Sequence, residues 1–332
     1  MILGIESTAH TFGVAVVKDG KILANVKDSY TTEKGGIIPV EAAKHHEEVA
    51  EKIYNKAINE AKINEKDIEA ISFSQGPGLS PCLLAGLRFT KKLAEKLRVS
   101  VVPVNHCVAH LEIGRITGAK DPVLLYASGA NTQIIAYAGG KYRVFGETLD
   151  IGIGNFIDTF ARYAGIGFPG GPKISELAEK SKNYIELPYS VKGMDVAFSG
   201  MLTKLKQMLQ SGKYKLEDLC FSLQETAFAM LVEAAERALA HTGKKELVLG
   251  GGVACNHRLQ EMCRKMCEER IQKTKLFCPA NEFLVDNAAM IAYLGLKMFN
   301  AGIYTKPFEL DKLDIKPRER TDEVAVKWKP KN

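Results

Sequence analysis

Apolar positions along the chain change repeatedly from alternating to helical spacing, which predicts an α/β protein. Residues 2–30 predict a three-stranded meander, because two apolar runs are followed by the hairpin turn Asp19-Gly20 and an alternating run. Residues 41–62 place apolar side chains on one face at helical spacing. Residues 68–74 and 99–104 predict two buried strands, separated by a loop with Gly and Pro and a further helix.

The second half of the chain repeats the opening pattern. Residues 122–148 again predict a strand, a small polar turn, a strand, a Gly139-Gly140 hairpin turn and a strand. The two openings share identical residues at an offset of 121: Ser7, Ala9, Thr11 and Ala15 align with Ser128, Ala130, Thr132 and Ala136. Because turn type, strand order and identities all match, we interpret the two halves as copies of one duplicated unit.

The remainder of the second half predicts further helices and strands. A long helix is expected over residues 215–242, a strand over 246–252 that ends in glycines, and a last helix over 286–302. Asn256 is expected to open the helix after the glycines. The Lys- and Pro-rich segment after the last helix is expected to wrap the surface.

Composition narrows the class of protein. The 332 residues are 46% hydrophobic and 25% charged, as in ordinary soluble domains, and charge interrupts every apolar stretch before the ~18 residues of a membrane helix. The start of the chain lacks the basic region and cleavage site of a signal peptide. Seven scattered cysteines argue against a disulfide framework, so we expect the reducing cytosol and packed thiols at Cys263 and Cys267. The net charge of +6 permits a nucleic-acid partner without requiring one.

Two histidines form the sharpest chemical signal. His106 and His110 follow a predicted strand and a capping residue, Asn105, and their spacing of four puts both imidazoles on one helix face. Two neutral imidazoles at this spacing can bind one transition metal, whereas the alternative is one capping and one packed histidine. In HExxH metallopeptidases a Glu base follows the first His. Here that residue is Cys107, so the protease base is missing.

Two acidic residues are further candidates. Asp286 begins the predicted last helix, where it could be a helix cap or a third metal ligand. Asp158 lies on an apolar face, where an unpaired carboxylate is costly. It is therefore either hydrogen-bonded structurally or directed at a ligand.

Glycine-rich turns indicate a nucleotide site. Each half opens with a small-residue turn whose N–H groups can bind phosphate oxygens, and Gly250, Gly251 and Gly252 precede a helix N-terminus. Each loop alone is weak evidence, because an ordinary β-turn explains it better than a binding site does. Together they match the layout of the actin, Hsp70 and sugar-kinase (ASKHA) fold, in which nucleotide lies between two lobes.

We therefore expect an α/β fold of two duplicated actin-like lobes with a cleft between them. The first lobe is predicted at residues 1–99 plus roughly 295–325, and the second at 100–294. Residues 326–332 are predicted to form a tail.

Several motifs together resemble one known family. They are MILGIESTAHTFGVAVV, QGPGLSPCLLAGL, NHCVAHLEIGR, YASGANTQ, GFPGGPK, AFSGM, GGGVACNHRLQEM and DNAAMIA. From residue 1 to about 325 the chain resembles the tRNA threonylcarbamoyl-adenosine transferase family, long labelled O-sialoglycoprotein endopeptidase. His10, where the bacterial branch has Asp, is similar to the archaeal and eukaryotic branch, the catalytic subunit of the KEOPS complex. We expect no fused kinase domain after residue 332.

The resemblance implies a metal, iron or alternatively zinc, and an adenine nucleotide in the cleft. The implied metal ligands are His106, His110, Tyr126 and Asp286. The implied nucleotide and substrate contacts are Tyr126, Ala127, Ser128, Gly129, Ala130, Asn131, Asp158, Gly171, Ser175, Glu176, Gly250, Gly251, Gly252 and Asn256. Ala130 stands where the family has a second glycine, and Ser175 stands at an acidic position. Glu176, one residue on, is a substitute only after a turn of ~100° around the helix.

The implied reaction transfers a threonylcarbamoyl group from threonylcarbamoyl-AMP to N6 of the tRNA adenosine at position 37. The proton acceptor stays open among His10, Glu6, Asp158 and a metal-bound hydroxide. Expected partners are tRNA, a small atypical protein kinase and small accessory subunits. The alternatives are a metallopeptidase, a non-catalytic nucleotide-binding scaffold and a small-molecule kinase.

Overall fold

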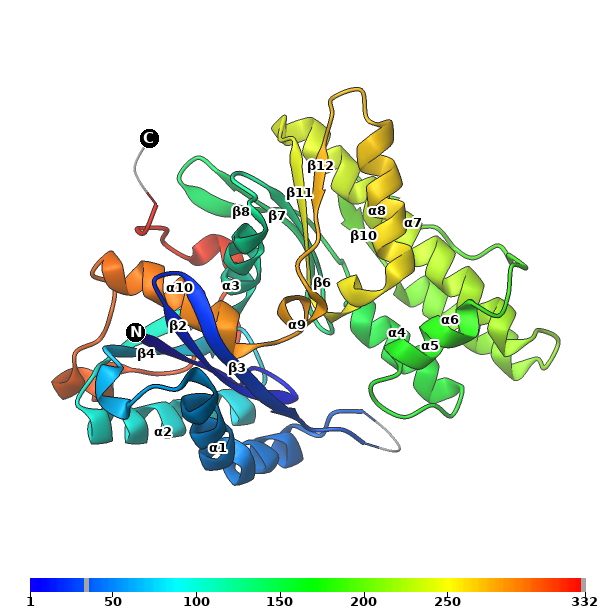
Figure 1. Ribbon diagram of the computed structural model, residues 1–332. Coiled ribbons are helices and arrows are strands. Elements are labelled where there is room, and N and C mark those ends of the chain that lie inside the picture. Colours follow the sequence, from blue (N-terminus) through cyan, green and yellow to red (C-terminus); the bar gives the residue numbers. More distant parts are fainter. Residues whose placement is uncertain (33–35, 330–332) are drawn as a thin grey trace.

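Two similar five-stranded sheets form the centres of the two lobes (Figure 1). The computed structural model describes residues 1–32 and 36–329. The first sheet has the order β3-β2-β1-β4-β5 and the second β8-β7-β6-β11-β12, so each strand of one sheet has a counterpart in the other. This matching order confirms the predicted duplication.

The strands of the first sheet are β1 (Ile2–Glu6), β2 (Thr11–Lys18), β3 (Lys21–Ser29), β4 (Ala70–Gly76) and β5 (Ser100–Asn105). Those of the second are β6 (Val123–Ala127), β7 (Thr132–Ala138), β8 (Lys141–Glu147), β11 (Glu246–Gly250) and β12 (Lys275–Phe277). A separate two-stranded ribbon, not predicted, joins β9 (Val191–Lys192) and β10 (Asp195–Val196).

Parallel pairing brings residues of the candidate functional site to one edge of each sheet. In the first sheet β1 pairs in parallel with β4, and β4 with β5, so Glu6 and Asn105 both end strands at that edge. In the second sheet β6 and β11 are parallel, which brings Ala127 and Gly250 to the corresponding edge. Ligands of open α/β sheets bind at the carboxyl ends of such strands.

Helices cover both faces of the first sheet and surround the second. They are α1 (Pro39–Ala61), α2 (Ser80–Leu97), α3 (His106–Ile113), α4 (Ile153–Tyr163), α5 (Gly171–Ala178), α6 (Ser199–Gln210), α7 (Leu216–Thr242), α8 (His257–Glu269), α9 (Asn281–Leu284) and α10 (Ala288–Asn300). The predicted helices are confirmed, and the short α9 was not predicted. The last helix begins later than expected, because Asn287 is its N-cap and accepts a hydrogen bond from the backbone of Met290.

Helix α10 packs directly on the first sheet although it follows the second lobe in sequence (Figure 1). A Cβ at Gly4 of β1 would lie 2.5 Å from the carbonyl oxygen of Ala288, so only glycine permits this approach. Strand β5 likewise belongs to the first sheet. The predicted boundary at 294/295 falls within α10, and the one at 99/100 separates β5 from its sheet, so we propose boundaries after Asn105 and before α10.

The segment after α10 runs from the first lobe to the second. The short helix η4 (Pro307–Lys312) contacts β5 and α2, and the backbone N–H of Lys316 donates to Gln75. Further on, η5 (Thr321–Glu323) contacts β8. The predicted surface path is confirmed for this part, whereas residues 330–332, including Lys331, lie outside the described residues. Within the described residues, helices long and apolar enough to cross a bilayer are absent.

All seven cysteines are free, which agrees with the predicted absence of a disulfide framework. Cys263 and Cys267 are buried on α8, as expected of packed thiols.

Candidate metal and nucleotide site

The histidine pair lies at the start of α3, directly after β5. The side chain of Asn105 accepts a hydrogen bond from the backbone N–H of Val108 at 3.1 Å and caps the helix, as predicted. His106 and His110 are both buried, and their ring centroids are 4.8 Å apart. The helix therefore presents two imidazoles on one face.

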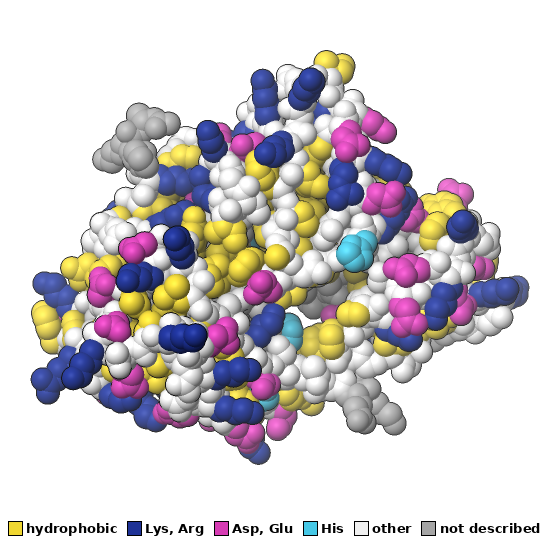
Figure 2. All heavy atoms as spheres, viewed as in Figure 1, with side chains coloured by type: hydrophobic (Ala, Val, Ile, Leu, Met, Phe, Trp, Pro, Cys, Tyr) yellow, Lys and Arg dark blue, Asp and Glu magenta, His cyan; other side chains and the backbone are white. Residues whose placement is uncertain are grey.

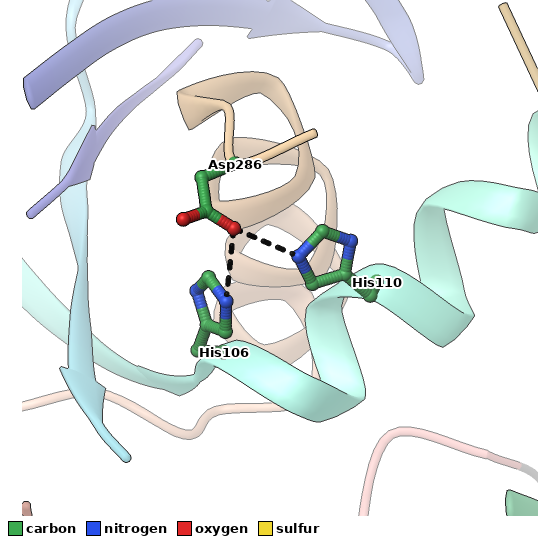
Figure 3. Close-up of side chains that lie close together, drawn as sticks. All are labelled: His106, His110 and Asp286. Carbon is green, nitrogen blue, oxygen red and sulfur yellow. Dashed lines mark hydrogen bonds and ion pairs between the residues drawn. The ribbon is translucent and has the colours of Figure 1, made fainter. Parts of the chain in front are cut away.

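Asp286, in the loop between α9 and α10, completes a three-residue cluster (Figure 3). Its Oδ1 lies 3.3 Å from Nε2 of His106 and 3.4 Å from Nε2 of His110. Across residues 1–32 and 36–329, this is the one group of three or more His, Cys, Asp or Glu side chains whose ligand atoms lie within 4.8 Å of one another. Two imidazole nitrogens and one carboxylate oxygen are a donor set that suits a divalent transition metal.

Glu6 fixes the orientation of His106 by contacting its Nδ1, the nitrogen that does not face Asp286. Its carboxylate is fully buried, and Oε2 lies 3.1 Å from Nδ1 of His106. The other oxygen, Oε1, accepts hydrogen bonds from the backbone N–H of Thr8 at 2.7 Å and from its hydroxyl at 2.5 Å. An ionised carboxylate can only accept, so Nδ1 of His106 carries a hydrogen and Nε2 of the neutral ring is left free for a metal.

The charges of the cluster favour a cation at its centre. Burial lowers the pKa of His106, but the charges of Glu6 and Asp286 outweigh it and hold this pKa well above its ordinary value. Burial opposes ionisation of Asp286, yet the two histidines hold its pKa well below the usual range. Burial lowers the pKa of His110, whose Nδ1 is buried without a hydrogen-bond partner. The residues present thus fit the predicted metal.

Tyr126, the fourth predicted ligand, lies at the end of β6 beside the cluster. Its ring is buried and tilted by 39° to that of His110, with the centroids 4.8 Å apart. Burial raises the pKa of Tyr126 well above its ordinary value. A protonated phenol is a weak metal ligand.

The turn after β6 leaves backbone groups open. The hydroxyl of Ser128 donates to the carbonyl of Asn131 at 2.8 Å and closes the turn, while Gly129 and Ala130 are exposed at its tip. The N–H groups of Gly154 and Asn155, at the start of α4, donate to the carbonyls of the turn.

The glycine junction after β11 passes close to this turn. A Cβ at Gly251, where φ is +89°, would lie 2.3 Å from the carbonyl oxygen of Ala127. A Cβ at Gly252 or Gly129 would meet only a side chain, at 3.9 Å and 3.5 Å respectively, and one at Gly171 would meet nothing within 4 Å. Gly129, Gly171 and Gly252 therefore have open space beside them, whereas Gly250 and Gly251 are buried, and Gly251 permits the close approach of two backbone segments.

Asn256 joins the glycine junction to α5 and α7. Its Oδ1 accepts from the N–H of Arg258 and caps α8, and its Nδ2 donates to Ser175 at 3.1 Å and to Gln224 at 2.8 Å. Glu176 instead forms surface ion pairs with lysines on either side of it. One helical position turns the side chain by ~100°, so Ser175 and not Glu176 reaches Asn256.

His10 and Asp158 lie away from the three-residue cluster. The ring of His10 packs edge-on against Phe168 of the second lobe, with centroids 5.4 Å apart. Oδ1 of Asp158 accepts from the N–H of Gly170 at 2.8 Å. Burial raises the pKa of Asp158, against the opposing effect of the Gly170 and Gly171 N–H groups and the charge of His10. The two candidate bases are thus neighbours from opposite lobes.

Three side chains of this region were not found from the sequence. Thr8 joins Glu6 to His106, and Gln224 accepts from Asn256. The pKa of Lys27 on β3 is lowered by burial, while nearby Asp286 and Cys255 raise it, so this ammonium lies beside the site. Thr8 could have been found as a polar residue that closely follows a strand of a parallel pair. No sequence pattern marked Gln224 or Lys27.

Comparisons with known proteins point to one family. The sequence profile described as tRNA N6-adenosine threonylcarbamoyltransferase matches residues 21–293. A protein of that name from Thermococcus sibiricus is 56% identical over 98% of this chain and 99% of its own length. One from Thermofilum pendens is 50% identical over 99% and 97%. A "probable bifunctional tRNA threonylcarbamoyladenosine biosynthesis protein" from Methanosarcina mazei is 52% identical over 98% of this chain, which spans 59% of it.

Solved structures with low sequence identity share the fold. HypF from Thermococcus kodakarensis has a TM-score of 0.62 at 15% identity, over 93% of this chain and 49% of that one. The activator of the 2-hydroxyisocaproyl-CoA dehydratase from Clostridium difficile, solved with ADPNP, has a TM-score of 0.57 at 12% identity, over 91% and 96%. Both are actin-like, which confirms the predicted fold class.

Proposed function

The chain belongs to the tRNA N6-adenosine threonylcarbamoyltransferase family, and we propose that it transfers the threonylcarbamoyl group of threonylcarbamoyl-AMP to N6 of adenosine 37 in tRNAs that read codons beginning with adenine. The observation that carries this proposal is the buried cluster of His106, His110 and Asp286 close to the open turn after β6. A donor set for a metal close to a turn that can bind phosphate oxygens suits transfer from an adenylate.

The metal would be held by His106, His110 and Asp286, with Tyr126 as a weaker ligand. We expect iron, with zinc as the alternative. When bound, the metal supplies a positive charge that polarises carbamoyl or phosphate oxygens and orients the donor. Glu6 and Thr8 keep Nε2 of His106 directed at this position.

The adenylate would lie between the turn at Ser128–Asn131 and the junction at Gly252. The exposed N–H groups at the tip of the turn suit phosphate oxygens. The amide and hydroxyl of Asn256 and Ser175 suit the polar groups of the nucleoside. Ala130 in place of a glycine leaves its N–H available, so this departure is compatible with phosphate binding.

The chemical step joins N6 of adenine to the carbamoyl carbon, breaks the bond between that carbon and the phosphate oxygen, and releases AMP and one proton. Because adenine N6 is a poor nucleophile, orientation and charge stabilisation should dominate the rate enhancement. Both oxygens of Glu6 are occupied by Thr8 and His106, which favours His10 or Asp158 as the proton acceptor.

One incubation separates the candidate functions. Purified protein is mixed with threonylcarbamoyl-AMP and tRNA, and modified nucleoside, casein cleavage and ATP turnover are measured together. Modified nucleoside alone supports the transferase. Casein cleavage would support the metallopeptidase, which lacks its base at Cys107, and nucleotide binding without any turnover would support a scaffold.

Partners follow from the distribution of charge. The face in Figure 2 shows Lys, Arg, Asp and Glu interspersed, whereas a protein that binds tRNA alone concentrates basic residues on one face. We propose that the chain works in the cytoplasm with a small atypical kinase and accessory subunits of a KEOPS-type complex. The bifunctional name and greater length of the Methanosarcina mazei relative are consistent with a second activity beside this one.

A salt titration tests the partner requirement. Affinity for tRNA is measured at several salt concentrations, for the chain alone and after addition of the partners. The complex should show a steeper fall of log affinity with log salt, because more phosphates are contacted. A full slope and full transfer rate for the chain alone would contradict the requirement.

A further inference from the structure

Two adjacent histidines of α1, His45 and His46, support the turn that carries His10. His46 is fully buried, and its Nε2 lies 3.0 Å from the carbonyl oxygen of Ala9. Its Nδ1 faces Nδ1 of His45 at 3.4 Å, and Nε2 of His45 lies 2.9 Å from Oδ1 of Asp28 on β3. A continuous hydrogen-bonded chain thus runs from Asp28 to the turn.

The chemistry of the partners determines where the hydrogens lie. A carbonyl oxygen can only accept, so Nε2 of His46 must donate to Ala9. Burial, followed by the charges of His45 and His10, lowers the pKa of His46 to about 4, so at neutral pH this ring is neutral and its Nδ1 is an acceptor. Nδ1 of His45 must then donate to it.

The other nitrogen of His45 faces a carboxylate, which also only accepts. For both contacts to be hydrogen bonds, His45 donates from each of its nitrogens, to His46 and to Asp28. The remaining neighbours of the two rings are aromatic: Phe12 lies 5.6 Å from His46, and Tyr30 lies 6.2 Å from His45, between ring centroids.

The same turn is fixed on its other side. The backbone N–H of Tyr30 donates to the carbonyl of His10 at 2.8 Å, and that of Leu79 donates to the carbonyl of Thr8 at 2.8 Å. Three consecutive carbonyls, at Thr8, Ala9 and His10, are therefore each held by a donor from a different element. The ring of His10 takes no part in these three hydrogen bonds and packs against Phe168 of the second lobe.

We propose that His46, held in one tautomer by the pair of His45 and Asp28, is a positioning residue that directs His10 toward Asp158 across the cleft. This inference rests on the proposed transferase function, because it assigns the fixed turn to the handling of the N6 proton. Breaking the bond to Ala9 would let the turn rotate and misplace the ring of His10, and misplacement by about 1 Å can cost ~100-fold in rate.

The tautomers are tested directly by NMR of 15N-labelled histidine in the full chain. We expect His46 to show a hydrogen on Nε2 only and His45 to show hydrogens on both nitrogens at pH 7. In Asp28→Asn, His45 should lose one of them, because its charged partner is gone. A hydrogen on Nδ1 of His46, or a singly protonated His45 in the unchanged chain, overturns the proposal whether or not the transferase assignment holds.

Kinetics test the positioning role. Gln can place an N–H donor near the position of Nε2, whereas Leu fills the space without a donor. We expect His46→Leu to lower kcat for tRNA modification by ~10- to 100-fold with little change in KM or metal content, and His46→Gln to recover most of it. The exposed His241→Gln is the control.

Equal losses in His46→Gln and His46→Leu, or no loss in either, would overturn the positioning role. Absence of modification by the unchanged chain with its partners present would instead refute the proposed function. The NMR result remains interpretable in that event.

Discussion

The two copies of the duplicated unit use the same turn in opposite ways. In the first copy, the carbonyls of the turn at Ser7–His10 accept hydrogen bonds from His46 of α1, from Leu79 before α2 and from Tyr30 after β3. In the second copy, the turn at Ser128–Asn131 closes on itself and exposes its tip. One strand–turn–strand unit therefore supports the proposed metal ligand His106 in one lobe and leaves backbone groups exposed in the other.

Three aligned positions account for the difference. At the offset of 121, Glu6, Thr8 and His10 correspond to Ala127, Gly129 and Asn131. The first copy places a carboxylate and a hydroxyl where they reach His106. The second copy has a methyl group and a hydrogen there, so the space stays open. A few side-chain differences between two similar turns are enough to fill one turn and leave the tip of the other exposed, as the proposed nucleotide site requires.

The largest effect is expected when the histidines of the three-residue cluster, one of which the first turn supports, are replaced. His106→Ala together with His110→Ala leaves only one ligand of the three-residue cluster, so metal binding should be lost entirely. Metal content is measured by elemental analysis and folding by circular dichroism, with His241→Ala as the control. Full metal occupancy in a folded double variant would place the metal elsewhere.

Converting the first turn toward the second should have the next largest effect. Glu6→Ala introduces the residue of the second copy and leaves Nδ1 of His106 without its acceptor. Loss of such an orienting partner typically lowers metal affinity by ~10- to 100-fold. Competition with a metal chelator measures the change. Unchanged affinity would mean that Glu6 does not orient the ligand.

The reverse change should close the second turn. Gly129→Thr introduces the residue of the first copy, and a Cβ there meets only a side-chain oxygen of Asn155 at 3.5 Å, so the fold should be kept. The added side chain should lower the affinity for AMP by ~10-fold or more, since it occupies the space before the exposed N–H groups. Calorimetric titration measures it.

Gly200→Thr, at an exposed position on α6, is the matched control. Gly251→Val, in contrast to Gly129→Thr, is expected to destabilise the fold, because a Cβ at position 251 would lie 2.3 Å from the backbone of Ala127. Unchanged affinity for AMP in Gly129→Thr would move the nucleotide away from this turn.

Much of this arrangement could be predicted from the sequence because local spacing determined it. The duplicated meanders, the capped helix of His106 and His110, and the glycine junction all follow from patterns within short segments. What periodicity does not reveal depends on contacts between distant segments. Tertiary packing determines that Ser175 and not Glu176 contacts Asn256, that β5 pairs in the first sheet, and that α10 packs on that sheet.

The smallest effect concerns the histidine that holds the first turn. The pKa of His46 is about 4 in the folded chain and ordinarily 6.5, so the unfolded chain binds more protons between these values. Stability should therefore be fully present above pH 6.5 and fall as pH drops toward 4, by ~1 kcal/mol at pH 5.5. His46→Gln should lack this part of the acid dependence. Identical pH profiles of urea unfolding for both chains would contradict a neutral, buried His46.

The position of α10 also has a consequence for synthesis on the ribosome. The strands of the first sheet are complete once Asn105 has been made, but Ala15 and Val17 on one face are covered by α10, which begins at Ala288. The 183 residues from His106 to Ala288 (288 − 105) take roughly 10 to 40 s to make at ~5–20 residues per second. Until then the apolar face at Ala15 and Val17 is uncovered, so the first lobe can complete its packing only after α10 has been made.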